Sequence, residues 1–248
     1  MLEAMLLRYL SVLGDAPMAF VVLSAAFVFA MLVSLSFHEY SHARVADYLG
    51  DRTPRAFGRL TLNPRAHLDP VGSLMILFVG FGWARPVPVN PMNTANPQRS
   101  LAMIGVAGPL SNLAMAALAG LPMQFGWVPF WHPFVSPQLA SRWAEVWTET
   151  PQDLIGLFLG TIVVINVLLA VFNLLPIAPL DGFNVAVGLA PRSLAEPLAR
   201  AAPWMPGILM VLILMPFLTG FSPLFDLMAP FINFFLDLFV GGGAIRFG

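Results

Sequence analysis

The sequence predicts an all-α polytopic membrane protein with about four to six transmembrane helices, because long apolar runs dominate it. Of its 248 residues, 58% are hydrophobic and only 10% are charged, whereas about 25% charged residues are usual in soluble domains. Several charge-free runs reach the length of about 20 residues that a helix needs to cross a bilayer. No internal repeat or polar linker divides the chain, so we expect one membrane-embedded domain over residues 1–248.

The membrane spans are expected where the longest charge-free runs lie. Four such runs are the clearest candidates: 18–37, 101–125, 154–175 and 204–221. A fifth run, 224–240, contains Asp226, Pro230 and Asp237, so it is expected to span imperfectly or to lie at the interface.

Both ends of the chain are expected outside the hydrocarbon core. Residues 1–16 mix apolar and charged side chains without the pattern of a cleaved leader, which predicts a retained interfacial segment. Three consecutive glycines predict a loose tail over 241–248.

Arginines mark one side of the predicted membrane domain. The segment 43–100 carries seven of them: Arg44, Arg52, Arg55, Arg59, Arg65, Arg85 and Arg99. The segment 127–153 has only Arg142 against three acidic residues. Because basic loops stay in the cytoplasm, we expect 43–100 on the cytoplasmic side of a prokaryotic cell membrane.

The composition also excludes some chemistry. The net charge is −1 and the chain contains no lysine, so no basic surface is available for nucleic acid. With no cysteine, disulfides and thiolate metal ligands are impossible, and a metal site must use His, Asp or Glu.

A short hairpin is predicted between the first two spans. Residues 71–84 are apolar and punctuated by glycine but too few to cross a bilayer comfortably, which favours a re-entrant segment or a buried hairpin. The stretch "RPVPVNP" at 85–91 alternates proline with valine or asparagine, which is typical of an extended edge strand or a polyproline segment.

The stretch "HEYSH" at 38–42 ends the first apolar run and carries the strongest chemical signal. His38 and His42 are four residues apart, so a helix places both imidazoles on one face, where they can bind one ion. Glu39 can then act as general base on water without being a ligand, as in the H-E-x-x-H motif. The alternative is a polar cap where the span reaches water. Ionisable groups in a span cost about 2.5 to 3.5 kcal/mol each, which favours a functional role.

Asp181 is the candidate third ligand, since a catalytic zinc has three protein ligands and one open position. It follows the apolar run 154–175 and lies among helix-breaking residues in "LLPIAPLDG", where backbone and carboxylate can line a cavity. The alternative is that Asp181 caps the helix that follows. Two imidazoles and one carboxylate suit zinc among the divalent metals.

These motifs resemble the site-2 protease family of intramembrane zinc metalloproteases, in a compact form without PDZ or CBS domains. The resemblance rests on "HEYSH", on "NLLPIAPLDG", and on the intervening stretches "GRLTLNPRAHLDPVG", "GWARPVPVNP" and "AGPLSN". It implies that His38, His42 and Asp181 bind Zn²⁺ and that Glu39 activates water. It also implies that the substrate is a transmembrane helix of another membrane protein, cut within or near its span.

Five further residues are secondary candidates. In the family, the asparagine matching Asn112 lies near the active site, so Asn112 is expected to contact the substrate or the oxyanion, the alternative being an interhelical hydrogen bond. Val87 and Val89 are expected to hold an unwound substrate by strand addition, the alternative being a hairpin that only covers the site. His67 is either an accessory ligand or substrate contact, or a turn residue. Asn173 is a possible accessory residue, or satisfies carbonyls freed by Pro176.

A second function remains open from the sequence alone. Broken helices with carboxylates at mid-membrane also mark transporters, so the same His, Glu and Asp residues could form an ion pathway. No inverted repeat supports a transporter, and a transporter does not need Glu39 between the two histidines.

Overall fold

The computed structural model describes residues 10–79, 82–135 and 137–242, and within these it contains helices but no strand. The predicted segment 1–16 is described only from Leu10, and most of the predicted tail 241–248 lies outside the described residues. The longer helices are α3 (Pro17–Tyr48), α6 (Pro70–Val79), α7 (Pro97–Gln124), α9 (Pro151–Asn173), α10 (Asp181–Leu189), α11 (Arg192–Ala201), α12 (Met205–Thr219) and α13 (Pro223–Val240). Shorter elements are α2 (Leu10–Asp15), α4 (Thr53–Ala56), α5 (Pro64–His67), η1 (Pro91–Asn93), α8 (Pro137–Trp143), η2 (Val146–Thr148) and η3 (Ala202–Trp204).

Five helices are long and apolar enough to cross a membrane, which confirms the predicted all-α membrane class. Four coincide with the clear apolar runs, and the fourth of them is longer than predicted because α11 and η3 lead into α12 to give one helical stretch, Arg192–Thr219. The fifth run forms α13, an 18-residue helix despite its internal Pro230.

Local sequence signals explain where the spanning helices begin. Pro17, Pro97 and Pro151 each occupy the first turn, where a fixed φ favours the helix and no N–H is needed. Asn96 caps α7 by accepting from the backbone N–H of Arg99. Thr150 opens α9 with a reciprocal capping box to the third helical residue.

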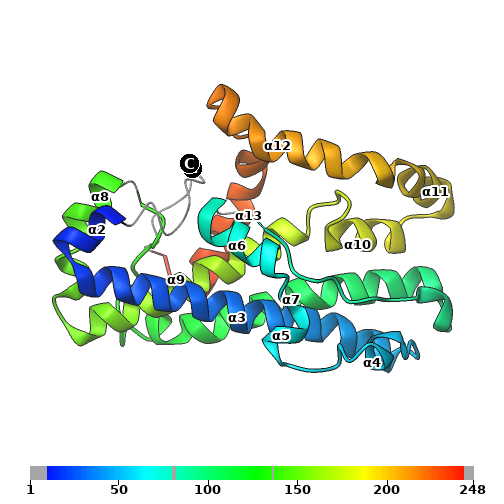
Figure 1. The fold of residues 1–248 in the computed structure, drawn as a ribbon, viewed down its shortest axis with the longest axis horizontal. Helices are drawn as coiled ribbons and strands as arrows, with labels where there is room; N and C mark the ends of the chain where they lie inside the picture. The colour runs from blue at the N-terminus through cyan, green and yellow to red at the C-terminus, as the bar shows by residue number, and fades with distance from the viewer. Residues whose placement is uncertain (1–9, 80–81, 136, 243–248) are drawn as a thin grey trace.

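The helices α3, α7 and α9 lie side by side and form the centre of the molecule (Figure 1). The largest apolar cluster joins α7 and α9 to α12 and α13, with Val163, Val167 and Ile232 fully buried. A second cluster, around Trp147, joins α2, α8 and the start of α3 at the opposite end from α10. The short helix α10 packs along α7, which brings the "LDG" turn against α3.

The predicted short hairpin is a ten-residue helix, α6, followed by an irregular segment. Leu68 and Ala84 form the one β-bridge within the described ranges. Residues 85–90 belong to no strand or helix, so the predicted edge strand has no partner strand here.

Candidate metal centre

His38 and His42 extend from one face of α3, as their four-residue spacing predicts. Their ring centroids are 4.7 Å apart and the rings are nearly perpendicular. Their Nε2 atoms approach each other to 3.0 Å. Both side chains are buried, so the two imidazoles meet in an apolar interior rather than at the water interface. This burial disfavours the alternative of a polar cap at the end of the span.

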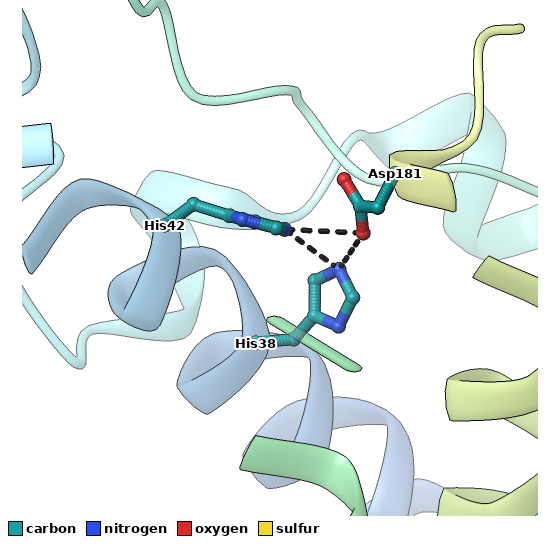
Figure 2. A group of neighbouring side chains, drawn as sticks. All are labelled: His38, His42 and Asp181. Atoms are coloured by element: carbon teal, nitrogen blue, oxygen red, sulfur yellow. Dashed lines mark hydrogen bonds and ion pairs between the residues drawn. The ribbon is translucent and has the colours of Figure 1, made fainter. Parts of the chain in front are cut away.

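Asp181 meets the two imidazoles from the other side. Its Oδ2 lies 3.1 Å from Nε2 of His38 and 3.2 Å from Nε2 of His42 (Figure 2). Asp181 is the first residue of α10, where Leu180 takes the cap position, and no side-chain cap hydrogen bond forms. The alternative role as a helix cap is therefore not what this geometry favours. The carboxylate faces the imidazoles instead.

Hydrogen bonds on the far side of each ring determine where the ring proton lies. Nδ1 of His38 is 2.6 Å from Oδ1 of Asn112, and Nδ1 of His42 is 2.6 Å from the backbone oxygen of Ile104. An oxygen of this kind can only accept, so each Nδ1 carries a proton and donates it. In the neutral imidazoles, both Nε2 atoms then present lone pairs to the shared point.

The three converging atoms fit a divalent metal ion. Two imidazole lone pairs and a carboxylate oxygen meet within 3.2 Å, and Oδ2 of Asp181 is buried with no hydrogen-bond donor among the described residues. Such an arrangement is repulsive without a cation. Ligand atoms about 2.0 to 2.1 Å from a tetrahedral zinc ion are separated by about 3.3 Å. The observed separations are close to this value, so these residues fit zinc.

Two glycines shape the centre by letting neighbouring segments approach closely. A Cβ on Gly108 of α7 would collide with Nε2 of His42 and lie 2.6 Å from Nε2 of His38. A Cβ on Gly182 would collide with the backbone oxygen of Leu174. The first glycine lets α7 pass beside the imidazoles, and the second lets α10 start close behind the end of α9.

Asn112 forms the interhelical hydrogen bonds given as its alternative role, and they continue to Asn166 and Ser34, whose roles sequence reasoning missed. Asn112 donates its amide nitrogen to Oδ1 of Asn166 at 2.9 Å, and Asn166 donates to Oγ of Ser34 at 2.9 Å. Asn112, Asn166 and Ser34 are fully buried. The available signal was Asn166 in the middle of the apolar run 154–175, since an amide inside a membrane helix needs a partner.

The other predicted site residues are not among the three ligands. Among the residues described, the group able to hold a metal comprises His38, His42 and Asp181, without His67. His67 is fully buried and donates from Nε2 to the backbone oxygen of Thr61 at 2.7 Å. Glu39 is buried on α3 beside His38. The substrate roles of Asn112, Val87 and Val89 stay predictions.

Asn173 takes a different position from the one expected. Its amide nitrogen donates to the backbone oxygen of Leu169 at 2.9 Å, one turn back in its own helix. The carbonyl four residues before Pro176 belongs to Phe172, and the N–H of Leu175 donates to it at 3.2 Å. The carbonyl of Phe172 thus accepts its hydrogen bond from the backbone and not from the Asn173 side chain. An accessory role of Asn173 at the site stays a prediction.

A buried two-histidine, one-carboxylate centre inside a bundle of membrane-length helices defines a membrane-integral metalloprotein. "Putative zinc metalloprotease YwhC" of Bacillus subtilis is 36% identical over 174 residues, which are 70% of this chain and 73% of that protein. "Putative zinc metalloprotease Rip2" of Mycolicibacterium smegmatis is 30% identical over 228 residues, which are 88% of this chain and 77% of that protein. The chain belongs to the family of these bacterial proteins, the site-2 protease family. No family model and no solved structure matches it.

These relatives also bear on the cofactor. Both are named for zinc, and the donor set of two imidazoles and one carboxylate suits that ion. Zn²⁺ is therefore the cofactor implied for the centre formed by His38, His42 and Asp181.

Proposed function

We propose that this protein is an intramembrane zinc endopeptidase that hydrolyses peptide bonds within or near the transmembrane segments of other membrane proteins. One observation carries the proposal: two imidazole lone pairs and a carboxylate oxygen converge within 3.2 Å in the interior of a membrane-helix bundle. The names of the relatives support a protease over the transporter alternative.

In this proposal His38, His42 and Asp181 hold the ion, and Glu39 performs the proton transfers. Zinc bound there would supply Lewis acidity, which lowers the pKa of water and polarises a carbonyl oxygen. Glu39 follows His38 directly on α3 and is buried, so it is positioned beside the ligands without being one of them. Its carboxylate accepts a proton from the attacking water and later donates a proton to the departing amine.

The substrate must present an extended backbone, because a helical peptide bond is shielded by its own hydrogen bonds. We assign this role to the segment 85–90, which lies between α6 and η1. Within the described chain, neither Val87 nor Val89 forms a backbone hydrogen bond to another segment. Their free N–H and C=O groups are available to pair with an unwound substrate by strand addition.

Metal content and cleavage measured together test the function. The unmodified protein, Glu39→Gln and His42→Ala would be purified in detergent, analysed for zinc and incubated with a panel of transmembrane peptides. We expect about one zinc per chain in the first two and none in the third. Cleavage should occur only in the unmodified protein, since loss of a general base costs about 10²- to 10⁴-fold.

The controls separate the possible failures. Circular dichroism and size-exclusion chromatography establish that each variant is folded. Folded, unmodified protein without zinc would refute the metalloprotease and favour an ion pathway through the same residues. Equal cleavage by Glu39→Gln and the unmodified protein would refute the role of Glu39 as base.

A further inference from the structure

A closed circuit of hydrogen bonds leaves α3 at His38 and returns to it at Ser34. Nδ1 of His38 donates to Asn112 on α7 at 2.6 Å, and Asn112 donates to Asn166 on α9 at 2.9 Å. Asn166 donates to Oγ of Ser34 at 2.9 Å, one helical turn from His38 on α3. Asn166 also donates to the backbone oxygen of Ile162 at 2.9 Å. The circuit thus joins the three central helices directly behind one metal ligand.

The backbone oxygen of Ile162 fixes the direction of every bond in this circuit. A carbonyl oxygen can only accept, so the Asn166 nitrogen must face Ile162. The Asn166 oxygen then faces Asn112 and accepts from its nitrogen. The Asn112 oxygen is left facing His38, whose Nδ1 must donate. Ser34 has a hydroxyl that can donate or accept, so it does not decide the direction.

The direction matters because it decides which nitrogen of His38 has a free lone pair. If the Asn112 amide were reversed, its nitrogen would donate to Nδ1 and the ring proton would move to Nε2. That proton would occupy the lone pair that now points at Oδ2 of Asp181, 3.1 Å away. Water cannot replace the missing partner easily, because Asn112 and Asn166 are both fully buried.

We propose that Asn166 is a positioning residue that, through Asn112, holds His38 in the tautomer that can bind the metal. This inference rests on the proposed metal centre but not on peptide cleavage. His42 provides an internal comparison, since its Nδ1 donates to the backbone oxygen of Ile104 and does not depend on the circuit. The tautomer of His42 should therefore not respond to changes at Asn166.

Two substitutions of nearly equal size test the proposal. In Asn166→Leu, nothing accepts from the Asn112 nitrogen, and the Asn112 amide is free to reverse. In Asn166→Asp, the introduced carboxyl still accepts from Asn112, and its protonated form also donates to Ile162. Thr161→Val is the matched control, because Thr161 is a buried polar residue of the same helix whose hydroxyl donates to the backbone oxygen of Leu157.

The readout is the ring-nitrogen NMR of ¹⁵N-histidine-labelled, metal-free protein, together with zinc affinity from chelator competition. In the unmodified protein, His38 should carry its proton on Nδ1. Asn166→Leu should populate the other tautomer at His38 but not at His42, and should weaken zinc binding by about 10- to 100-fold. Asn166→Asp and Thr161→Val should keep both the tautomer and the affinity of the unmodified protein.

Three results would overturn the proposal. These are an Nδ1 of His38 without a proton in the unmodified protein, an unchanged His38 in Asn166→Leu, or equal losses in the Leu and Asp variants. The last result would mean that Asn166 only fills space. Because the tautomer is read without metal, the expected tautomer pattern in a protein that cleaves no peptide would support this inference while refuting the proposed protease.

Discussion

Gly108 determines how closely α7 approaches the two imidazoles. A side-chain carbon at this position would collide with Nε2 of His42 and lie 2.6 Å from Nε2 of His38. These are the two atoms whose lone pairs converge on Asp181. A single hydrogen in place of a methyl group is thus what leaves room for the centre between α3 and α7.

We predict that Gly108→Ala removes stoichiometric zinc and lowers cleavage by about 100-fold, because even an ångström of displacement at a reacting centre has an effect of this size. Gly207→Ala is the matched control, since a Cβ at this position on α12 would meet nothing within 4 Å. Elemental analysis and peptide cleavage of both variants check the prediction. Normal zinc content in folded Gly108→Ala would contradict it.

The sequence alone predicted the ligands from local patterns and Asn112 from the family resemblance, but it missed Asn166 and Ser34, whose contacts depend on helix packing. His38 and His42 are four residues apart on one helix, and Asp181 lies among helix-breaking residues, so both signals are local. The contact of Asn112 with His38 depends on the packing of α7 against α3, across 74 residues of sequence. No periodicity in a single chain encodes such a pairing, and the circuit through Asn166 was missed for the same reason.

The segment 85–90 is anchored at its two ends, and its two valines have no backbone hydrogen-bond partner among the described residues. At its start, the N–H of Arg85 donates to the backbone oxygen of His67 at 2.7 Å. At its end, the N–H of Asn90 donates to Oδ2 of Asp51 at 2.7 Å. Val87 and Val89 have no backbone hydrogen bond within the described chain. The segment is thus held in place while these residues stay available.

Asp51 is the main anchor at the end of that segment. It is fully buried and accepts from Thr53 and from Asn93 as well as from Asn90. Burial by itself would raise the pKa of Asp51, but these hydrogen bonds outweigh it and hold the pKa below the ordinary value of a carboxyl group. The carboxylate therefore stays ionised at neutral pH and keeps its full capacity to accept.

If an unwound substrate pairs with this segment, removing one N–H should weaken cleavage without disturbing the metal. We predict that Val87→Pro lowers cleavage of transmembrane peptides by up to about tenfold, the effect of one or two lost hydrogen bonds. Val87→Ala, which keeps the N–H, should cleave like the unmodified protein. Both variants should retain zinc. Equal cleavage by the Pro and Ala variants, at equal zinc content, would argue against strand addition.

For α6 and the segment that follows it, the sequence predicted the local structure better than the contacts that hold it in place. The ten-residue helix α6 agrees with a run too short to span, because helix length follows directly from the number of apolar residues. The bridge between Leu68 and Ala84, and the bond from Asn90 to Asp51, join residues distant in sequence. Such contacts depend on how the loop folds back over α3, which local patterns do not specify.

Over the whole molecule, the arginines collect at one end of the helix bundle. Seven lie in 43–100, which connects the end of α3 to the start of α7. The side chain of Gln98, at the start of α7, donates to the backbone oxygen of Ala190 at 2.7 Å. The fold therefore brings the start of α11 to the same end (Figure 1), and α11 begins at Arg192. From the sequence, a loop could be assigned to one end of the bundle only by counting the spans before it. The hydrogen bond from Gln98 to Ala190 instead joins the end of α10 directly to the start of α7.

The opposite end of the bundle carries acidic and aromatic residues instead. Trp131 stacks edge-on with Trp143 and donates to Asp153 at the start of α9. Glu145 and Glu149 are exposed near the same helix start. From this asymmetry and the positive-inside rule, we expect the arginine-rich end to lie in the cytoplasm.

This orientation gives a prediction that the composition makes easy to check. The chain has no cysteine, so any introduced thiol is the only one available to a membrane-impermeant maleimide. Leu62→Cys would place an exposed thiol at the arginine-rich end, and Glu149→Cys would place one at the acidic end. In intact spheroplasts we expect the Glu149→Cys protein to be labelled and the Leu62→Cys protein to be protected until the membrane is permeabilised. The reverse pattern would mean that arginine count does not set the orientation, and that an extracytoplasmic segment 85–90 meets the substrate.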